Sequence, residues 1–168
     1  ADIQYGGVDQ RKIFGFARES HPKIGQKKRV EVMTPKLPGI MGGKMSSSDA
    51  ASKVDLLDGP EDIEVKINKA YCPEGELADN GIMAFMKYVI MVLKQDKDET
   101  FLIERPEKFG GQVEYKTYDD LERDFMDKKL HPQDLKKALS RELVEILRPV
   151  REYFTDKRGL VEAAYPEE

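Results

Sequence analysis

One stretch of this chain resists regular secondary structure and therefore constrains the fold around it. Residues 42–48 read Gly-Gly-Lys-Met-Ser-Ser-Ser, and Pro35, Pro38 and Gly39 interrupt the approach to them. The glycines let the backbone approach a ligand closely, Lys44 supplies a mobile charge, and the serine hydroxyls bond to phosphate oxygens. The pattern favours a polyphosphate-binding loop, although the Walker A spacing is missing. A glycine- and serine-rich linker that carries one lysine is the alternative.

Upstream of this loop, the sequence predicts a strand, a glycine turn and a helix in succession. Residues 1–5 alternate as a short strand and run into Gly6 and Gly7. The apolar residues of the helix recur at helical spacing: Ile13, Phe14, Phe16 and Ala17. Asp9 and Gln10 then lie at the helix N-terminus, where Asp9 is a candidate to bond a ribose hydroxyl and Gln10 to serve a polar substrate group. The alternative is that Asp9 only caps the helix.

The residue patterns divide the chain into three parts. Residues 1–57 hold the strand, the turn, a second strand candidate at residues 29–33 and the glycine-lysine-serine loop. Residues 58–154 read as mostly helical, and residues 155–168 as a loose tail. The predicted fold class is therefore α/β followed by mostly α.

Local signals place several boundaries in the helical part. Asn80 and Thr117 are predicted helix caps, and Pro132 is expected to begin the longest helix. Pro149 should kink that helix or end its regular part. Two short segments are expected to pair as strands, residues 101–103 and 113–115.

Composition excludes several classes of protein. The net charge of −4 is not that of a general nucleic-acid binder, so any RNA contact must use a local face. No apolar run approaches a membrane span and no signal peptide is visible, which favours a soluble, cytoplasmic protein. The single cysteine, Cys72, rules out an intrachain disulfide and argues against a cysteine-based metal site. No metal ligands are predicted, and Cys72 reads as a small buried residue.

Two motifs in this order resemble a known family. Gly-Gly-Val-Asp-Gln-Arg-Lys at residues 6–12, followed by Lys-Met-Ser-Ser-Ser at residues 44–48, is similar to the second half of a class I aminoacyl-tRNA synthetase active site. The detail resembles tyrosyl-tRNA synthetases of the eukaryotic and archaeal type. Three further matches extend the resemblance to about Phe154: residues 105–111, 130–136 and 148–151.

The resemblance implies a fold and a reaction. Residues 1–57 would be the C-terminal part of a Rossmann-like catalytic domain, and residues 58–154 a helical anticodon-binding domain. In the implied reaction, ATP with Mg²⁺ activates L-tyrosine as tyrosyl-adenylate, and the tyrosyl group then moves to tRNA(Tyr). The whole enzyme is expected to be a homodimer.

The resemblance also assigns site residues. The implied catalytic residues are Lys44, Ser46, Ser47 and Ser48. The implied ATP contacts are Gly7, Asp9, Met33, Leu37, Lys44, Met45, Ser46 and Ser47. Gln10 is expected near the tyrosine carboxylate.

The anticodon residues implied by the family motifs are Phe109, His131, Asp134 and Lys136. Phe109 and His131 would stack on an unpaired guanine, and Asp134 would accept hydrogen bonds from its edge. Lys136, with Lys137 beside it, would meet the phosphates. The alternatives are a core aromatic at Phe109, a helix-entry turn at His131, and simple helix N-terminal placement for Asp134.

One departure from the family pattern is large. The family begins its nucleotide-binding fold with a His-x-Gly-His type signature, and neither His21 nor His131 fits it. The chain therefore resembles a C-terminal portion, which we expect to be inactive alone. Two other readings stay open: a tryptophanyl-tRNA synthetase, or an RNA-binding or interaction module without catalysis.

Overall fold

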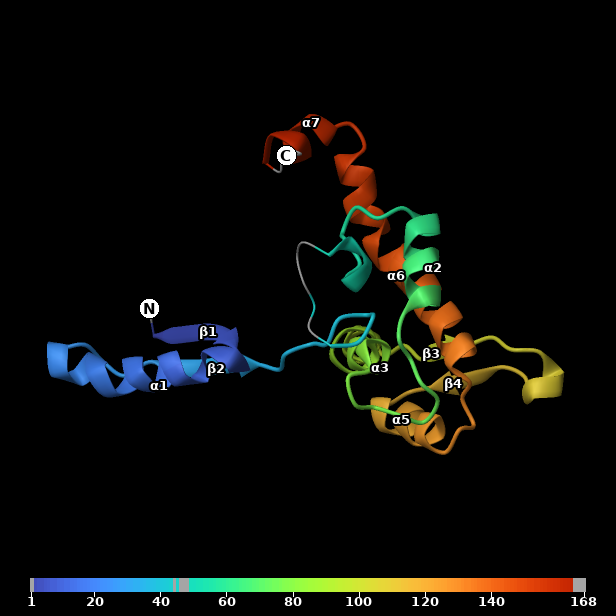
Figure 1. The fold of residues 1–168 in the computed structure, drawn as a ribbon, viewed down its shortest axis with the longest axis horizontal. Helices are drawn as coiled ribbons and strands as arrows, with labels where there is room; N and C mark the ends of the chain where they lie inside the picture. The colour runs from blue at the N-terminus through green and yellow to red at the C-terminus, as the bar shows by residue number, and fades with distance from the viewer. Residues whose placement is uncertain (1, 44, 46–48, 165–168) are drawn as a thin grey trace. The chain divides into compact units, whose positions relative to one another are not determined.

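The chain folds into two compact units, residues 1–37 and residues 38–168. The structure, a computed structural model, describes residues 2–43, 45 and 49–164 (Figure 1). We call residues 1–37 the N-terminal unit and residues 38–168 the helical unit. The division falls twenty residues before the boundary expected at residue 57. The reason is packing, because Ile40 belongs to the hydrophobic core of the helices and the partly buried Val54 packs against it.

The N-terminal unit is a strand, a helix and a second strand. Its elements are β1 (Ile3–Gly7), the 3₁₀ helix η1 (Val8–Gln10), α1 (Arg11–Ser20), the 3₁₀ helix η2 (His21–Ile24) and β2 (Val30–Thr34). The two strands pair in parallel, from Ile3 with Val30 to Gly7 with Thr34, which requires the helical crossover between them. Phe14 is buried, and its ring lies so close to Gly6 that a Cβ there would be 2.7 Å from Cζ. The predicted strand and helix are confirmed, but the predicted glycine turn is wrong, because Gly6 and Gly7 lie inside β1 and η1 connects the strand to α1.

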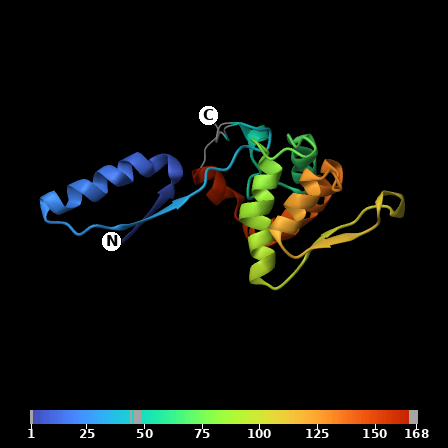
Figure 2. The same ribbon diagram turned by 90° about the horizontal axis from the view of Figure 1, so that it is seen from below.

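The helices and strands described after β2 all belong to the helical unit. Its helices are η3 (Ala50–Ser52), α2 (Pro60–Lys69), α3 (Gly81–Phe85), the π-helix η4 (Met86–Ile90), α4 (Met91–Asp96), η5 (Glu107–Phe109), α5 (Tyr118–Met126), α6 (Pro132–Phe154) and α7 (Arg158–Ala164). Its strands β3 (Phe101–Ile103) and β4 (Val113–Tyr115) pair antiparallel. The two strand segments lie where the sequence predicts them. The loop between them extends away from the helices in both ribbon views (Figures 1 and 2).

The predicted helix boundaries have a local physical cause. The Asn80 side chain accepts a hydrogen bond from the Met83 amide, and Thr117 accepts one from the Asp120 amide. Both therefore act as the predicted N-caps. Pro132 occupies the first turn of α6, as expected.

Two expectations about the C-terminal end need correction or refinement. Helix α6 does not end at Pro149 but continues to Phe154. The segment expected to be a loose tail forms α7, although none of its residues is buried and Leu160 is 63% exposed. Leu160 and Val161 line an apolar pocket together with Val150 and Phe154 of α6.

The core of the helical unit lies between α2, α3, α5 and α6. Its fully buried side chains include Ile63, Ile67, Ile82, Phe101, Phe125 and Leu135. Cys72 is buried as predicted, and burial raises the pKa of its thiol. Among the described residues, no helix has the length and apolar character needed to span a bilayer.

Candidate functional site

The carboxyl ends of β1 and β2 meet at one edge of the N-terminal unit. Gly7 pairs with Thr34 there, and the Thr34 hydroxyl donates to the Gly6 carbonyl at 3.4 Å. Asp9 and Gln10 follow β1 directly at this edge. In open α/β sheets, ligands bind outside the carboxyl ends of the strands. The structure thus places the predicted ribose and substrate residues where such folds bind ligands.

Asp9 contacts both of the other predicted residues at the end of β1, Gly7 and Gln10. The Asp9 carboxylate folds back over Gly7, in the space where a Cβ of any other residue would stand. Gln10 Nε2 donates to Asp9 Oδ2 at 3.1 Å. Because Gly7 and Gln10 occupy the N-cap positions of η1 and α1, Asp9 is not the helix cap that the alternative reading required. Its carboxylate lies at an exposed edge with one polar neighbour oriented beside it.

The residues expected beside the adenine follow β2. Met33 pairs with Gly6 and is 39% exposed, so it is not a core residue. Leu37 ends the N-terminal unit and is half-buried. Met33 lies on β2 and Leu37 follows it, and the end of β2 pairs with Gly7.

Backbone hydrogen bonds connect the described residues that flank the glycine-lysine-serine loop. Lys44, Ser46, Ser47 and Ser48 lie outside the described residues. The Ile40 amide, before these residues, donates to the Ser52 carbonyl, after them, at 3.0 Å, and this bond forms a closed base that joins the two sides of the loop. Before Lys44, the Gly39 amide also donates to the Gly43 carbonyl at 2.9 Å.

Glycine is required on the approach to this loop for two physical reasons. Gly42 and Gly43 have φ angles of 83° and 68°, in the left-handed region that favours glycine. A Cβ on Gly42 would also stand 3.2 Å from the Tyr71 ring. Beyond the loop, Asp49 Oδ1 accepts from the Ala51 amide at 3.0 Å and so caps η3. Met45 is 40% exposed, so its side chain is accessible to a ligand.

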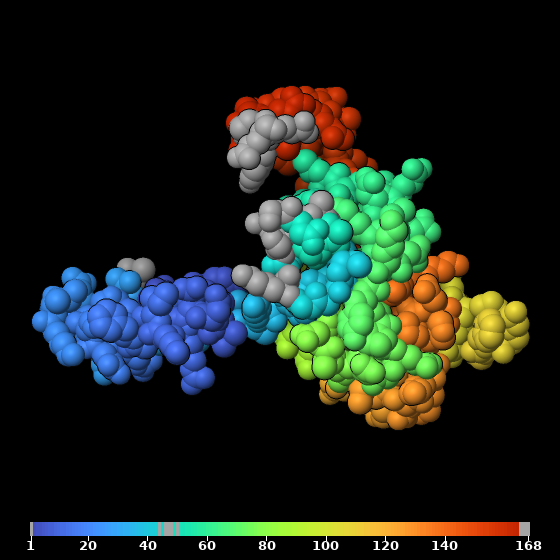
Figure 3. Space-filling view, viewed as in Figure 1, coloured from blue at the N-terminus to red at the C-terminus, as the bar shows by residue number. Residues whose placement is uncertain are grey.

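A second candidate site lies on the β3–β4 loop. Phe109 ends the short helix η5 in this loop and is 60% exposed, so the reading as a core aromatic is wrong. Lys108 Nζ lies 4.8 Å from the centroid of its ring. Figure 3 shows the loop, in yellow, protruding from the surface of the helical unit. An exposed aromatic ring beside a cation is suited to stacking on a nucleobase.

His131 and Asp134 lie together at the start of α6. His131 is the N-cap, and its Nδ1 accepts from the Gln133 amide at 3.1 Å. That bond assigns the ring proton to Nε2 in the neutral imidazole. The Asp134 amide donates to the His131 carbonyl, so the two residues belong to one helix turn. His131 therefore caps the start of α6, as the alternative interpretation predicts. Its ring is exposed, so it can still make a second contact.

Lys136 does not lie on the surface, where a contact with an RNA phosphate would require it to be. It is only 6% exposed, and its Nζ donates to the carbonyls of Ala70 at 2.6 Å and Asn68 at 3.2 Å. These carbonyls belong to the C-terminal end of α2, where a cation is favoured by the helix dipole. Lys136 thus joins α2 to α6, and its expected role in phosphate binding is withdrawn. The signal was in the sequence, because Lys136 shares the inner face with Leu139 and Leu143 at helical spacing.

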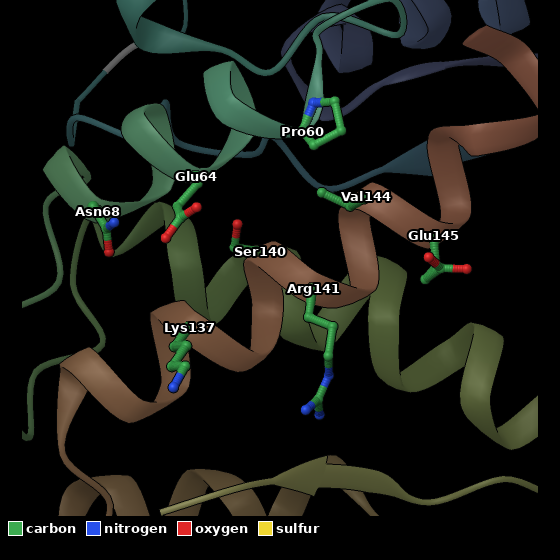
Figure 4. Close-up of a pocket in the computed structure, with 8 residues that line it drawn as sticks. All are labelled: Pro60, Glu64, Asn68, Lys137, Ser140, Arg141, Val144 and Glu145. Atoms are coloured by element: carbon green, nitrogen blue, oxygen red, sulfur yellow. The ribbon is translucent and has the colours of Figure 1, made fainter. Parts of the chain in front are cut away.

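The neighbouring Lys137 is exposed and lines a pocket of about 270 Å³ between α2 and α6. Figure 4 shows its side chain on α6 and those of Glu64 and Asn68 on α2, around the same pocket. Opposite charges are mixed here, so the pocket has no single sign. Among the described residues, no cluster of three or more His, Cys, Asp or Glu side chains is arranged to hold a metal ion.

Comparison with known proteins agrees with the motifs. The family described as tRNA synthetases class I (W and Y) matches residues 1–148. The chain is 47% identical over 167 residues to the tyrosine–tRNA ligase of Natronomonas pharaonis, covering 99% of this chain and 48% of that protein. It is 46% identical to the cytoplasmic tyrosine–tRNA ligase of Gallus gallus, over 98% of this chain and 31% of that protein.

Solved structures give the same result. A tyrosyl-tRNA synthetase from Archaeoglobus fulgidus, complexed with L-tyrosine, superposes with a TM-score of 0.83 and 41% identity, over 90% of this chain and 46% of that one. A tryptophanyl-tRNA synthetase from Giardia lamblia has a TM-score of 0.64 at 22% identity, a likeness of fold alone. The chain spans half or less of the length of these relatives. By its sequence match and its fold, the chain belongs to the class I tRNA synthetase family that comprises the tryptophan and tyrosine enzymes.

Proposed function

We propose that the chain is part of a tyrosine–tRNA ligase, which activates tyrosine with ATP and transfers it to tRNA(Tyr). The observation that carries this proposal is identity of 44–47% to proteins named tyrosine–tRNA ligase across nearly the whole chain. The tryptophanyl alternative has only the likeness of fold at 22% identity. The cytoplasmic relatives support the same location for this protein.

In the first step, the tyrosine carboxylate attacks the α-phosphorus of ATP, and pyrophosphate leaves. Catalysis is then positioning and charge stabilisation, without a covalent enzyme intermediate. Lys44 and the hydroxyls of Ser46, Ser47 and Ser48 bind the leaving phosphates, and Met45 lines the same loop. The closed base between Ile40 and Ser52 supports this role. Mg²⁺ bound with ATP would share the negative charge of the phosphates.

The strand edge of the N-terminal unit binds the rest of the nucleotide. Asp9 accepts from a ribose hydroxyl, Gly7 allows the sugar close to the backbone, and Gln10 lies near the tyrosine carboxylate. Met33 and Leu37 border the adenine. The exposed Asp9 carboxylate, oriented by Gln10 Nε2, supports this assignment.

The whole enzyme also needs more sheet than this unit supplies. Parallel strands are normally buried on both faces, yet Ile3, Tyr5 and Val30 are 63%, 70% and 60% exposed. The relatives are at least twice as long as this chain. We therefore assign this apolar face to packing against the remainder of a Rossmann-like catalytic domain. The whole enzyme is proposed to be a homodimer, which sedimentation measurements would test.

The helical unit is proposed to bind the anticodon. Phe109 and His131 stack on an unpaired guanine, and Asp134 accepts from the N–H groups of its edge. The exposure of Phe109 and the shared helix turn of His131 and Asp134 support this arrangement. Binding is measured by fluorescence anisotropy with anticodon stem-loops that carry guanine or adenine at the first anticodon position. Asp134→Asn should reduce the preference for guanine.

The catalytic proposal is tested by Lys44→Ala in a whole enzyme that carries this sequence. We expect adenylate formation to slow about 100-fold, because one charge on the transferred phosphates is lost, while tyrosine affinity stays unchanged. Lys53→Ala is the matched control, since Lys53 lies beyond the loop and pairs with Asp55 at 2.9 Å. Equal loss of tyrosine affinity and rate in pre-steady-state kinetics would contradict the role of Lys44. Tyrosine-dependent pyrophosphate exchange by the 168-residue chain alone would contradict its dependence on the rest of the enzyme.

A further inference from the structure

One arginine joins the two separate segments that carry the anticodon residues. Arg105 follows β3, and its Nε donates to the Gly111 carbonyl at 2.7 Å, across the base of the Phe109 loop. Its Nη1 donates to the Lys129 carbonyl at 2.9 Å, in the connection between α5 and α6. Lys129 stands two residues before His131. The planar guanidinium donates in two directions at once, which a lysine ammonium on a flexible stem does less well.

The loop is shaped to receive this guanidinium. Gly110 and Gly111 have φ angles of 95° and 68°, so both need glycine. A Cβ on Gly110 would stand 3.2 Å from Arg105 Nη2, so the backbone there lies against the guanidinium. Gly111 is buried, although its neighbours in the loop are exposed. The side of the loop that faces Arg105 is therefore fixed, while the side with Phe109 faces solvent.

The other end of the link is fixed as well. The amides of Lys129 and Leu130 both donate to the Asp124 carbonyl, at 2.9 and 3.2 Å. Leu130 is fully buried in the core. The segment that leads to His131 is thus anchored to α5, and Arg105 ties the Phe109 loop to this anchored point.

We propose that Arg105 is a positioning residue for base recognition, which sets the separation between Phe109 and the His131–Asp134 turn. This inference rests on the proposed anticodon role. Two stacking surfaces must be held at a set distance to receive one base, and a mobile loop would have to be ordered at each binding event. Arg105 removes that cost by holding the loop before RNA arrives.

The test compares Arg105→Gln with Arg141→Gln in the 168-residue chain. Arg141 is a matched control, because its Nη2 donates to the Leu102 carbonyl at 2.8 Å and its Nη1 pairs with Glu104 at 2.9 Å. It thus ties α6 to β3 and to the first residue after β3, whereas the Arg105 bonds reach Gly111 and Lys129. Both variants lose arginine-to-carbonyl bonds, so both should lower the melting temperature modestly. We expect Arg105→Gln to weaken binding of the guanine stem-loop about tenfold and Arg141→Gln less than about twofold. Arg105→Lys, which keeps the charge and one donor group, should lie between them.

Two further measurements separate a positioning role from a general loss of stability. The ratio of guanine to adenine stem-loop affinity should fall only in Arg105→Gln, and the amides of Gly110 and Gly111 should exchange faster in that variant alone. Equal losses in Arg105→Gln and Arg141→Gln would overturn the inference, as would unchanged RNA affinity in Arg105→Gln. If Arg105→Gln binds RNA normally, Phe109→Ala and His131→Ala show which proposal is wrong. Normal RNA binding by these two variants would mean that the anticodon proposal itself is wrong. Weak binding by them would mean that only the proposed role of Arg105 is wrong.

Discussion

Replacing Lys136 by methionine distinguishes a structural lysine from an RNA-binding one. Methionine keeps the length and apolar stem of the side chain and removes the ammonium. The two hydrogen bonds from Nζ to the carbonyls of Ala70 and Asn68 are lost. Lys136 lies 66 positions after Ala70 and 68 positions after Asn68 in the sequence, so the loss of these bonds directly affects the packing of α2 on α6.

The expected loss of stability follows from the number of hydrogen bonds that the substitution removes. Hydrogen bonds to a charged group contribute about 2 kcal/mol each. These contributions are already net of the hydrogen bonds to water that the groups give up, so no separate burial cost is subtracted. We expect Lys136→Met to lower the free energy of unfolding by about 2–4 kcal/mol, or the melting temperature by roughly 5–15 °C.

The chain has no tryptophan, so unfolding is followed by far-ultraviolet circular dichroism. The matched control is Lys137→Met, which replaces an exposed neighbour and should change stability by less than about 0.5 kcal/mol. If Lys136 instead contacted a phosphate, Lys136→Met would leave the melting temperature unchanged. It would then reduce the slope of log affinity against log salt for single-stranded RNA by about 0.7. That pair of results would refute the structural role.

Two further predictions concern a titrating phenol and two glycines. Burial, with Asp124 beside the hydroxyl, raises the pKa of Tyr115 to about 12. The folded state therefore favours the neutral phenol, so its contribution is complete below pH 10 and is lost as the pH rises toward 12. Urea unfolding at pH 8 and pH 11 should show a smaller loss of stability in Tyr115→Phe than in the parent chain, and equal losses would contradict the assignment. Gly81→Ala should destabilise the helical unit by about 2 kcal/mol or more, because a Cβ there overlaps the Gly39 carbonyl. Gly15 lies within α1 with open space around it, so Gly15→Ala should instead raise stability by about 0.5–1 kcal/mol. Thermal unfolding measures both variants, and a lower melting temperature for Gly15→Ala than for Gly81→Ala would contradict the reasoning.

Much of the fold follows from local patterns. The caps at Asn80 and Thr117, the start of α6 at Pro132 and the two short strands all depend on residues within four positions of one another or on alternation. Such signals are complete within a short window, so sequence analysis recovers them. Asp9 and Gln10 were predicted by the same logic, since the residues after a strand lie at its carboxyl end.

The candidate sites were recovered less completely. Phe109 and His131 are exposed, so their base contacts stay a prediction that the structure allows, but the expected phosphate contact of Lys136 is wrong because that side chain is buried. Its charge suggested solvent, whereas its helical spacing indicated the core. Arg105 carried no sign of its role, because its partner Lys129 lies 24 residues along the chain.

The sequence by itself determined which segments become helices and strands, which residues have the chemistry for phosphate and base contacts, and the family to which the motifs point. These properties arise from each residue and its near neighbours along the chain. Only the tertiary structure decided that residues 38–57 pack with the helices, that Lys136 is buried against α2, and that Arg105 joins the β3–β4 loop to the segment before α6. Such contacts depend on which surfaces exclude water together, and that is settled when distant parts of the chain pack.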